Sequence, residues 1–183
     1  MTPAIDITQM GLSDVAILHK VCSDLYSQNF HNHWDEGGLE KYIDKVFGVD
    51  ILKTELSGNN IQYYIAVADQ KPVGFMKLNL FSNLPGMDMK KGMELEKMYI
   101  LPARKRMKIG TRLLDVAFDA AKSSHKEIFW LSVIDTNQEA ISFYEKAGFN
   151  FHSKIRVDYP KFREELKGMW RMYLEVPRVK APV

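Results

Sequence analysis

The sequence predicts an α/β protein with a mixed central sheet flanked by helices, and three observations carry that prediction. Short apolar runs rich in β-branched and aromatic residues mark strands in both halves of the chain. Between them, apolar residues recur at three- and four-residue spacing, which is typical of amphipathic helices. The predicted elements follow the order β-α-α-β-β-β-α-β-α-β-β, which combines hairpin connections with helical crossovers.

The N-terminal part is expected to be one strand followed by helices. The strand covers Ala4–Thr8. Ser13 has a side chain suited to capping the helix that follows, and helical spacing continues to about Gln28. Further helical patterns cover Leu39–Phe47 and, over a shorter stretch, Ile51–Leu56.

Strands and two helices alternate through the rest of the chain. Asp69-Gln70-Lys71-Pro72 is typical of a hairpin turn between two strands, and a polar loop follows at positions 82–91. The strands are expected at Gln62–Ala68, Val73–Leu80, Met93–Leu101, Ile128–Val133, Phe149–Val157 and Met169–Val176, with helices at Gly110–Lys122 and Asn137–Lys146.

Size and composition favour a single domain, residues 1–183, with a frayed tail at 177–183. A net charge of +2 argues against nucleic acid as a bulk partner. The single cysteine, Cys22, lies in a helical apolar pattern, so we expect a core position and a reducing compartment. Without a leader or a membrane-spanning apolar run, we expect a cytoplasmic protein with no membrane partner.

The most informative stretch runs from Asn137 to Phe149. It reads as a short helix with an amide side chain at its start and a glycine stop, Gly148, at its end. Asn137 is suited to capping the helix or to contacting a ligand there. Tyr144 is not needed for helix formation, and its phenol can donate a proton to a group that lies along the helix.

The spacing Asn-x-x-Ala-x-x-Phe-Tyr-x-x-x-Gly-Phe resembles the second signature of the GNAT superfamily of N-acetyltransferases. The resemblance implies that Asn137 contacts the pantetheine arm of coenzyme A. It also implies that Tyr144 protonates the sulfur as the thiolate leaves. The element order of the whole chain is that of the same fold, and Phe143 is expected to help form the coenzyme site.

A second candidate site follows the strand that ends at Leu101. A strand, a basic turn and a helix start form an anion site, because first-turn N–H groups lack internal partners and the helix dipole is positive there. Gly110 is expected to let a phosphate approach the backbone closely. The residues of this predicted site are Lys105, Arg106, Met107, Lys108, Ile109, Gly110 and Thr111.

This segment resembles the GNAT pyrophosphate loop, with departures. Lys105 stands where Gln or Arg is usual, and Lys108 where the first glycine is usual. Because Lys108 has a Cβ, we expect its backbone to avoid the conformations that favour glycine. The alternative to a coenzyme site is a solvated basic turn or a nucleic-acid patch.

The strand before this loop carries charged residues. The resemblance implies that the backbone of Met98, Tyr99 and Ile100 binds the pantetheine amides. Alternation along a strand predicts Glu96 on one face and Lys97 with Tyr99 on the other. Glu96 is the candidate general base if burial raises its proton affinity, and otherwise a salt-bridged glutamate.

The chain contains, in order, Gln28-Asn29-Phe30, Glu40-Lys41-Tyr42-Ile43, Gly74-Phe75-Met76-Lys77-Leu78-Asn79 and Phe129-Trp130-Leu131-Ser132-Val133. Together these segments resemble the PaiA-like branch of the family, which is associated with acetylation of spermidine and spermine. The resemblance implies acetyl-CoA as the cosubstrate, no metal, and direct attack on the thioester by a small primary amine, with polyamines as the acceptor class of this branch. A peptide or protein amine and a non-catalytic coenzyme-A-binding sensor are the alternatives. A homodimer through the last strands is expected from the family.

Overall fold

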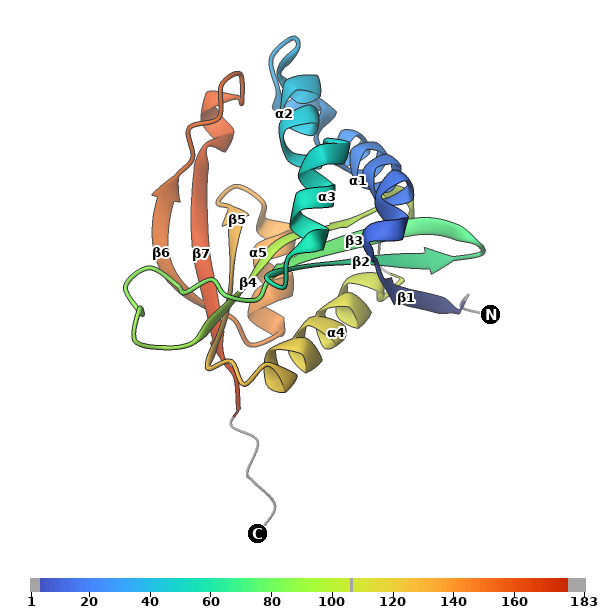
Figure 1. Ribbon diagram of the computed structural model, residues 1–183. Helices are drawn as coiled ribbons and strands as arrows, with labels where there is room; N and C mark the ends of the chain where they lie inside the picture. The colour runs from blue at the N-terminus through green and yellow to red at the C-terminus, as the bar shows by residue number, and fades with distance from the viewer. Residues whose placement is uncertain (1–3, 106, 178–183) are drawn as a thin grey trace.

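One sheet of seven strands organises the computed structural model, which describes residues 4–105 and 107–177 (Figure 1). The strand order across the sheet is β1-β2-β3-β4-β5-β7-β6. Only β4 and β5 pair in parallel, whereas the other neighbours are antiparallel. The strands are β1 (Ile5–Gln9), β2 (Ile61–Ala68), β3 (Lys71–Asn79), β4 (Gly92–Ile100), β5 (Ile128–Ile134), β6 (Asn150–Arg156) and β7 (Gly168–Glu175).

Helices cover both faces of this sheet, so the predicted α/β class, mixed sheet and element order are confirmed (Figure 1). Helices α1 (Val15–Phe30), α2 (Gly38–Phe47) and α3 (Val49–Ser57) lie on one face, over the N-terminal strands. Helices α4 (Ile109–Ser123) and α5 (Gln138–Lys146) lie on the other. The two faces are called below the α1–α3 face and the α4–α5 face.

Two apolar cores fix this arrangement. Between the sheet and α4 and α5, the core contains Leu113 of α4, Leu131 of β5 and Met172 of β7. Between the sheet and α1–α3, the core contains Leu18 of α1 and Phe75 of β3. Side chains alternate along each strand between these cores, which explains why β3 and β5 read as almost continuous apolar runs.

Local chemistry explains where the elements differ from expectation. Ser13 does not cap α1: it lies in a short 3-10 helix, Leu12–Asp14, where Asp14 Oδ2 accepts from Gly11 N–H at 2.8 Å. The hairpin between β2 and β3 is confirmed, and its turn is only Asp69 and Gln70. Both have positive φ, 51° and 60°, as a two-residue type I′ turn requires.

Three more 3-10 helices occur among the described residues: η2 (His31–His33), η3 (Pro102–Arg104) and η4 (Glu164–Leu166). No helix in residues 4–105 and 107–177 is long and apolar enough to span a membrane. Positions 178–183 of the expected frayed tail lie outside the described residues.

Candidate active site

The two central strands separate halfway along their length. Pairing between β4 and β5 ends at Leu95 and Leu131. Beyond these residues β4 continues along β3 to Ile100, while β5 continues along β7 to Ile134. The strands therefore form a fork, whose inner edges carry backbone groups that β4 and β5 no longer exchange.

The end of β4 presents two of the three predicted residues to this fork by their backbone. Leu101 N–H donates to a β3 carbonyl at 2.8 Å. Because backbone groups alternate in direction along a strand, those of Met98 and Ile100 face the fork and those of Tyr99 face β3. Asn29 of α1 already donates from Nδ2 to Ile100 O at 3.1 Å. The Met98 N–H is thus the clearest donor that β4 directs into the fork.

The first turn of α4 follows a residue in the left-handed region. Lys108 has φ 59° and ψ 15°, and its carbonyl accepts from Arg112 N–H at 3.1 Å to begin the helix. The expectation that Lys108 avoids this conformation is wrong. A single non-glycine residue tolerates the left-handed conformation at modest cost. Here that conformation turns the chain just before α4 starts. The N–H groups of Ile109, Gly110 and Thr111 then lack helical partners.

Gly110 is a close-packed position, and the approach of a phosphate to its backbone stays a prediction. It is buried, and a Cβ there would stand 3.0 Å from Ile100 Cδ1 and 3.4 Å from Phe143 Cζ. The missing side chain therefore lets α4 lie close to both β4 and α5. Through this contact, the predicted coenzyme residues of three separate segments meet around the fork.

The basic residues of the loop are only partly free. Lys105 forms an ion pair with Glu139 of α5 at 2.9 Å, and Arg104 forms one with Asp69 of the β2–β3 hairpin at 3.3 Å. Both pairs are solvent-accessible and hence weak. Lys108 is exposed, Met107 packs against the core, and Arg106 lies outside the described residues.

Helix α5 brings the second signature to the same place. Asn137 Oδ1 accepts from Ala140 N–H at 3.1 Å, so the side chain caps the helix. Tyr144 is buried in the α4–α5 core, with its ring 5.2 Å from that of Phe143 and 5.6 Å from that of Phe149. Burial raises the pKa of Tyr144, which keeps the phenol protonated at neutral pH.

Tyr99 and Tyr144 lie on opposite faces of the sheet. Tyr99 packs in the α1–α3 core and Tyr144 in the α4–α5 core. The pKa of Tyr99 is raised by burial first, then by Tyr42, Tyr26 and Glu96, and in part by Tyr144.

Glu96 lies in a buried ion-pair chain. A bulge in β4 opposite Lys77 adds one residue to the strand, and Glu96 is that residue. Lys77 contacts Glu55 of α3 at 2.7 Å and Glu96 at 2.9 Å, while Lys97 pairs with Glu96 from the adjacent position. Asn79 donates to Glu96 Oε2 at 2.9 Å. The expectation that Glu96 and Lys97 face opposite ways is wrong, because the bulge breaks the alternation.

The proton affinity of Glu96 is low. Burial alone would raise its pKa, but Lys97 and Lys77 outweigh burial and lower the pKa of Glu96 to about 2. For Lys97, burial opposes the charge, yet Tyr42 and Glu96 raise its pKa. The salt-bridged alternative thus describes Glu96 better than a base with raised proton affinity.

An aromatic cluster lies beside these ion pairs, and it was not predicted from the sequence. The Tyr26 ring lies 4.9 Å from Tyr42 and 5.6 Å from Tyr99, and Trp34 lies 4.8 Å from Tyr42. A lysine inside the apolar run of β3, Lys77, was the sequence signal that could have revealed the buried charges.

Cys22 is fully buried in the α1–α3 core, which confirms the core interpretation. Burial raises the pKa of its thiol, so a thiolate nucleophile is disfavoured. Among the described residues, no group of three or more His, Cys, Asp and Glu side chains is arranged to hold a metal ion.

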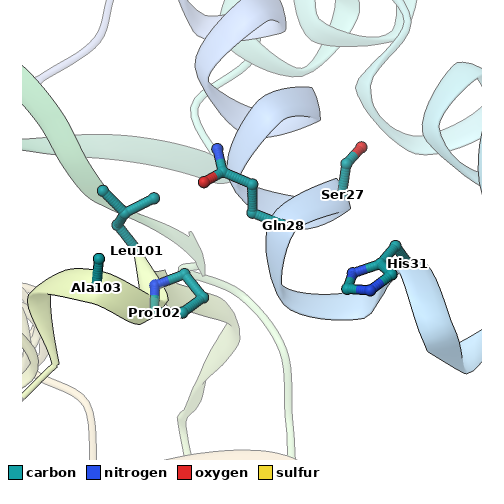
Figure 2. Close-up of a pocket in the computed structure, with 6 residues that line it drawn as sticks. All are labelled: Ser27, Gln28, His31, Leu101, Pro102 and Ala103. Atoms are coloured by element: carbon teal, nitrogen blue, oxygen red, sulfur yellow. The ribbon is translucent and has the colours of Figure 1, made fainter.

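An open pocket lies beside the end of β4. Its volume is about 600 Å³, and Figure 2 shows that α1 supplies one wall and the β4–α4 connection the other. The Gln28 amide points across the pocket toward Leu101, and His31 lies on the side of the pocket away from Leu101. The lining residues are Ser27, Gln28, His31, Leu101, Pro102 and Ala103. The pocket therefore gives access to the segment between Ile100 and the first turn of α4.

Known proteins show the same fold. A crystal structure of a PaiA N-acetyltransferase from Thermoplasma acidophilum, in complex with coenzyme A, has a TM-score of 0.72 at 23% identity over 94% of this chain and 99% of its own. A spermidine N-acetyltransferase SpeG mutant from Vibrio cholerae has a TM-score of 0.67 at 15% identity over 93% of each chain.

Sequence comparison agrees with the fold. An uncharacterised N-acetyltransferase from Lactobacillus delbrueckii subsp. lactis is 21% identical over 150 residues, which cover 82% of this chain and 87% of the relative. The family model described as the acetyltransferase (GNAT) family matches residues 20–149. The chain is thus an N-acetyltransferase by descent, and it belongs to the GNAT family.

Proposed function

We propose that this chain transfers the acetyl group of acetyl-CoA to a primary amine of a small molecule, by direct attack of the amine. The observation that carries the proposal is the fork between β4 and β5, which the Met98 N–H faces and beside which Gly110 of the first turn of α4 packs against Ile100 and Phe143. The relative from Thermoplasma acidophilum was solved with coenzyme A, which supports the choice of cosubstrate.

The coenzyme would lie along the α4–α5 face of the fork. The unpartnered N–H groups of Ile109, Gly110 and Thr111, with the positive end of the α4 dipole, suit a pyrophosphate. The backbone of Met98 and Ile100 suits the amides of a pantetheine arm. Lys105–Lys108, Asn137 and Phe143 complete the proposed coenzyme site. The expected backbone contact of Tyr99 is not part of this proposal, because its backbone faces β3 and its side chain packs in the α1–α3 core.

The transfer needs two things from the protein. Acetyl-CoA supplies a thioester carbon, to which the amine nitrogen forms a new bond as the carbon–sulfur bond breaks. The Met98 N–H polarises the carbonyl oxygen. Tyr144 donates its proton to the departing sulfur and recovers one from solvent. Burial of Cys22 leaves no role for an acyl-enzyme.

The proton that the amine loses needs a separate route. A carboxylate with a pKa near 2 is a weak acceptor for an alkylammonium proton. We therefore propose that Glu96 stays ionised and attracts the ammonium group, and that the proton leaves through water.

Polyamines are the acceptors suggested by the name of the Vibrio cholerae relative. The charges beside the fork do not favour them. Glu55 and Glu96 are matched by Lys77 and Lys97 in the same chain of ion pairs. A polycation would require an excess of carboxylates, so spermidine is one arm of the test rather than the proposed acceptor.

A thiol-release assay with acetyl-CoA tests the proposal. The panel contains butylamine, spermidine, an amino acid and a tripeptide with a free α-amine. Turnover of small amines above the rate of thioester hydrolysis is expected. Turnover confined to the tripeptide would favour a peptide acetyltransferase. Calorimetric binding of acetyl-CoA without turnover of any amine would favour a sensor.

A further inference from the structure

A guanidinium group beside the fork has no ion-pair partner among the carboxylates of residues 4–105 and 107–177. Arg171 of β7 is in register with Ser132 of β5 on one side and with Ser153 of β6 on the other. These three residues, called here the Arg171 patch, form one row across the C-terminal strands. All three residues are partly exposed, although Arg171 Nε and Ser153 Oγ themselves are buried atoms.

The patch lies on the face where an acceptor would approach. The next residue, Met172, is fully buried in the α4–α5 core, so Arg171 points to the α1–α3 face. Helices α1–α3 pack over β1–β4 there and leave β5, β7 and β6 to other segments. The α4–α5 face is the one assigned above to the coenzyme.

The hydrogen-bonding capacity of the patch is unfilled. Arg171 Nε and Ser153 Oγ are both buried, and neither has a hydrogen-bond partner among the described residues. None of the ion pairs within residues 4–105 and 107–177 includes Arg171. Buried donors are nearly always satisfied in folded proteins, so two unpaired groups side by side indicate a missing partner.

The guanidinium is held in place from one side. Its Cζ atom lies 6.0 Å from the ring centre of Trp130, and Trp130 Nε1 donates to Ser82 O at 2.8 Å. An aromatic neighbour orients the planar guanidinium without neutralising its charge. Arg171 therefore presents N–H donors arranged in a planar fork.

The register places the patch at the level where β4 and β5 separate. The last pair between β4 and β5 joins Leu95 and Leu131. The first residues beyond this pair are Glu96 in β4 and Ser132 in β5. Both are on the α1–α3 face of the sheet. A small acceptor with its amine in the fork would thus have Glu96 on its β4 side and the Arg171 patch on its β5 side.

We propose that the acceptor is an amine that also carries an anionic group, a carboxylate or a phosphate, and that Arg171 with Ser132 and Ser153 binds this group. The inference rests on the acetyl transfer proposed above and names the acceptor class. Arg171 acts as a specificity-determining residue: it binds the end of the acceptor that does not react.

Pairs of matched acceptors test whether the Arg171 patch binds an anionic group. The pairs are 4-aminobutyrate with butylamine and O-phosphoethanolamine with ethanolamine, and spermidine is the cationic comparison. Each pair keeps the reacting amine and changes only the anionic group. The parent protein is expected to show a kcat/KM at least about tenfold higher for one anionic member than for its neutral match. Which pair shows it distinguishes carboxylate from phosphate.

Arg171→Gln is the test variant. It should lower kcat/KM for the anionic acceptor by about 10- to 100-fold, mainly through KM, because a charge-assisted hydrogen bond is lost. Rates with the neutral amine and the affinity for acetyl-CoA should stay at parent values. Lys154→Gln is the matched control: it removes one positive charge from the neighbouring strand at an exposed position in register with Trp170, and the preference should remain.

Ser153→Ala gives a second readout. Removing a buried hydroxyl without a partner should raise the Tm of the free protein and lower kcat/KM for the anionic acceptor only. Equal rates for anionic and neutral acceptors in the parent would overturn the inference and leave acetyl transfer intact. Equal losses for both members of a pair in Arg171→Gln would overturn it too. No turnover of any amine would refute the acetyl transfer itself, and the inference with it.

Discussion

Glu96 and Lys97 are consecutive residues of β4, and both side chains lie on the same face of the sheet, paired with each other. The bulge opposite Lys77 makes this possible, and Lys77 reaches the same carboxylate from β3 at 2.9 Å. One carboxylate thus contacts two buried lysines at the point where the fork opens, and Glu55 supplies the second negative charge through Lys77. The arrangement gives Glu96 a role in holding β4, and it makes proton abstraction unfavourable.

Glu96→Gln should therefore lower the free energy of unfolding substantially and change the turnover number little. Removing one partner from a buried ion pair costs about 3 kcal/mol, because the lysines lose their counter-charge. The turnover number at pH 8 should stay close to that of the parent, whereas loss of a general base would cost a hundredfold or more. Urea unfolding and steady-state kinetics measure the two quantities, with exposed Glu165→Gln as the control.

The pH dependence of stability follows from the same pairs. The pKa of Glu96 is depressed from 4.5 to about 2. Its ion pairs therefore stabilise the fold fully above pH 4.5, and this stabilisation is lost as the pH falls toward 2. Acid unfolding curves of the parent and of Glu96→Gln should converge below pH 3. Parallel curves down to pH 2 would contradict the assignment.

Thr111→Asp should change stability and coenzyme affinity in opposite directions. Thr111 is exposed in the first turn of α4, where an acidic side chain stabilises a helix by roughly 0.3–1 kcal/mol. The same charge would repel a pyrophosphate and weaken coenzyme A binding by about tenfold or more. Calorimetry with coenzyme A and thermal unfolding measure both effects. Thr111→Asn is the neutral control, and equal affinities of the two variants would refute the site.

Lys108→Gly should stabilise the protein by up to about 1 kcal/mol. Lys108 has φ 59°, which costs a residue with a Cβ more than it costs glycine, although glycine also loses more entropy on folding. Lys108→Ala removes the same charge and keeps the Cβ, so this variant should be no more stable than the parent. Thermal unfolding of both separates conformation from charge. A gain of equal size in the alanine variant would show that charge repulsion, not φ, is relieved.

Much of the fold could be predicted because it depends on local patterns. Alternating apolar runs gave the strands, and the glycine stop at Gly148 gave the end of α5. The second signature was recognisable because its spacing brings Asn137 and Tyr144 together within one helix. These features need no knowledge of which strand pairs with which.

What could not be predicted depends on contacts between distant segments. The bulge at Glu96 arises from the register of β3 on β4, and a strand read alone shows only alternation. The need for glycine at position 110 comes from Ile100 and Phe143, which lie on two other elements. The row formed by Arg171, Ser132 and Ser153 depends on the order β5-β7-β6, in which β7 inserts between two strands that precede it.

Tyr144→Phe tests the general acid directly. The phenol is buried, and burial raises its pKa, so it stays protonated and able to donate across the neutral range. The variant removes only the hydroxyl, and the ring contacts with Phe143 and Phe149 remain. The turnover number should fall by about a hundredfold with little change in coenzyme affinity. Single-turnover kinetics should establish that chemistry limits the rate in both proteins.

Tyr64→Phe provides the matched control for this measurement. Tyr64 is also buried in the α4–α5 core, and its hydroxyl donates to Gln62 Oε1 at 2.9 Å on β2, which lies two strands across the sheet from β4. That variant should lose some stability and keep the parent turnover number, because the Tyr64 hydroxyl has no part in the proposed transfer.

The pH profile adds a further check on Tyr144. Because its pKa is raised, Tyr144 should produce no fall in kcat between pH 7 and 9. A Tyr144→Phe protein that turns over at the parent rate would assign the proton to water or to another group.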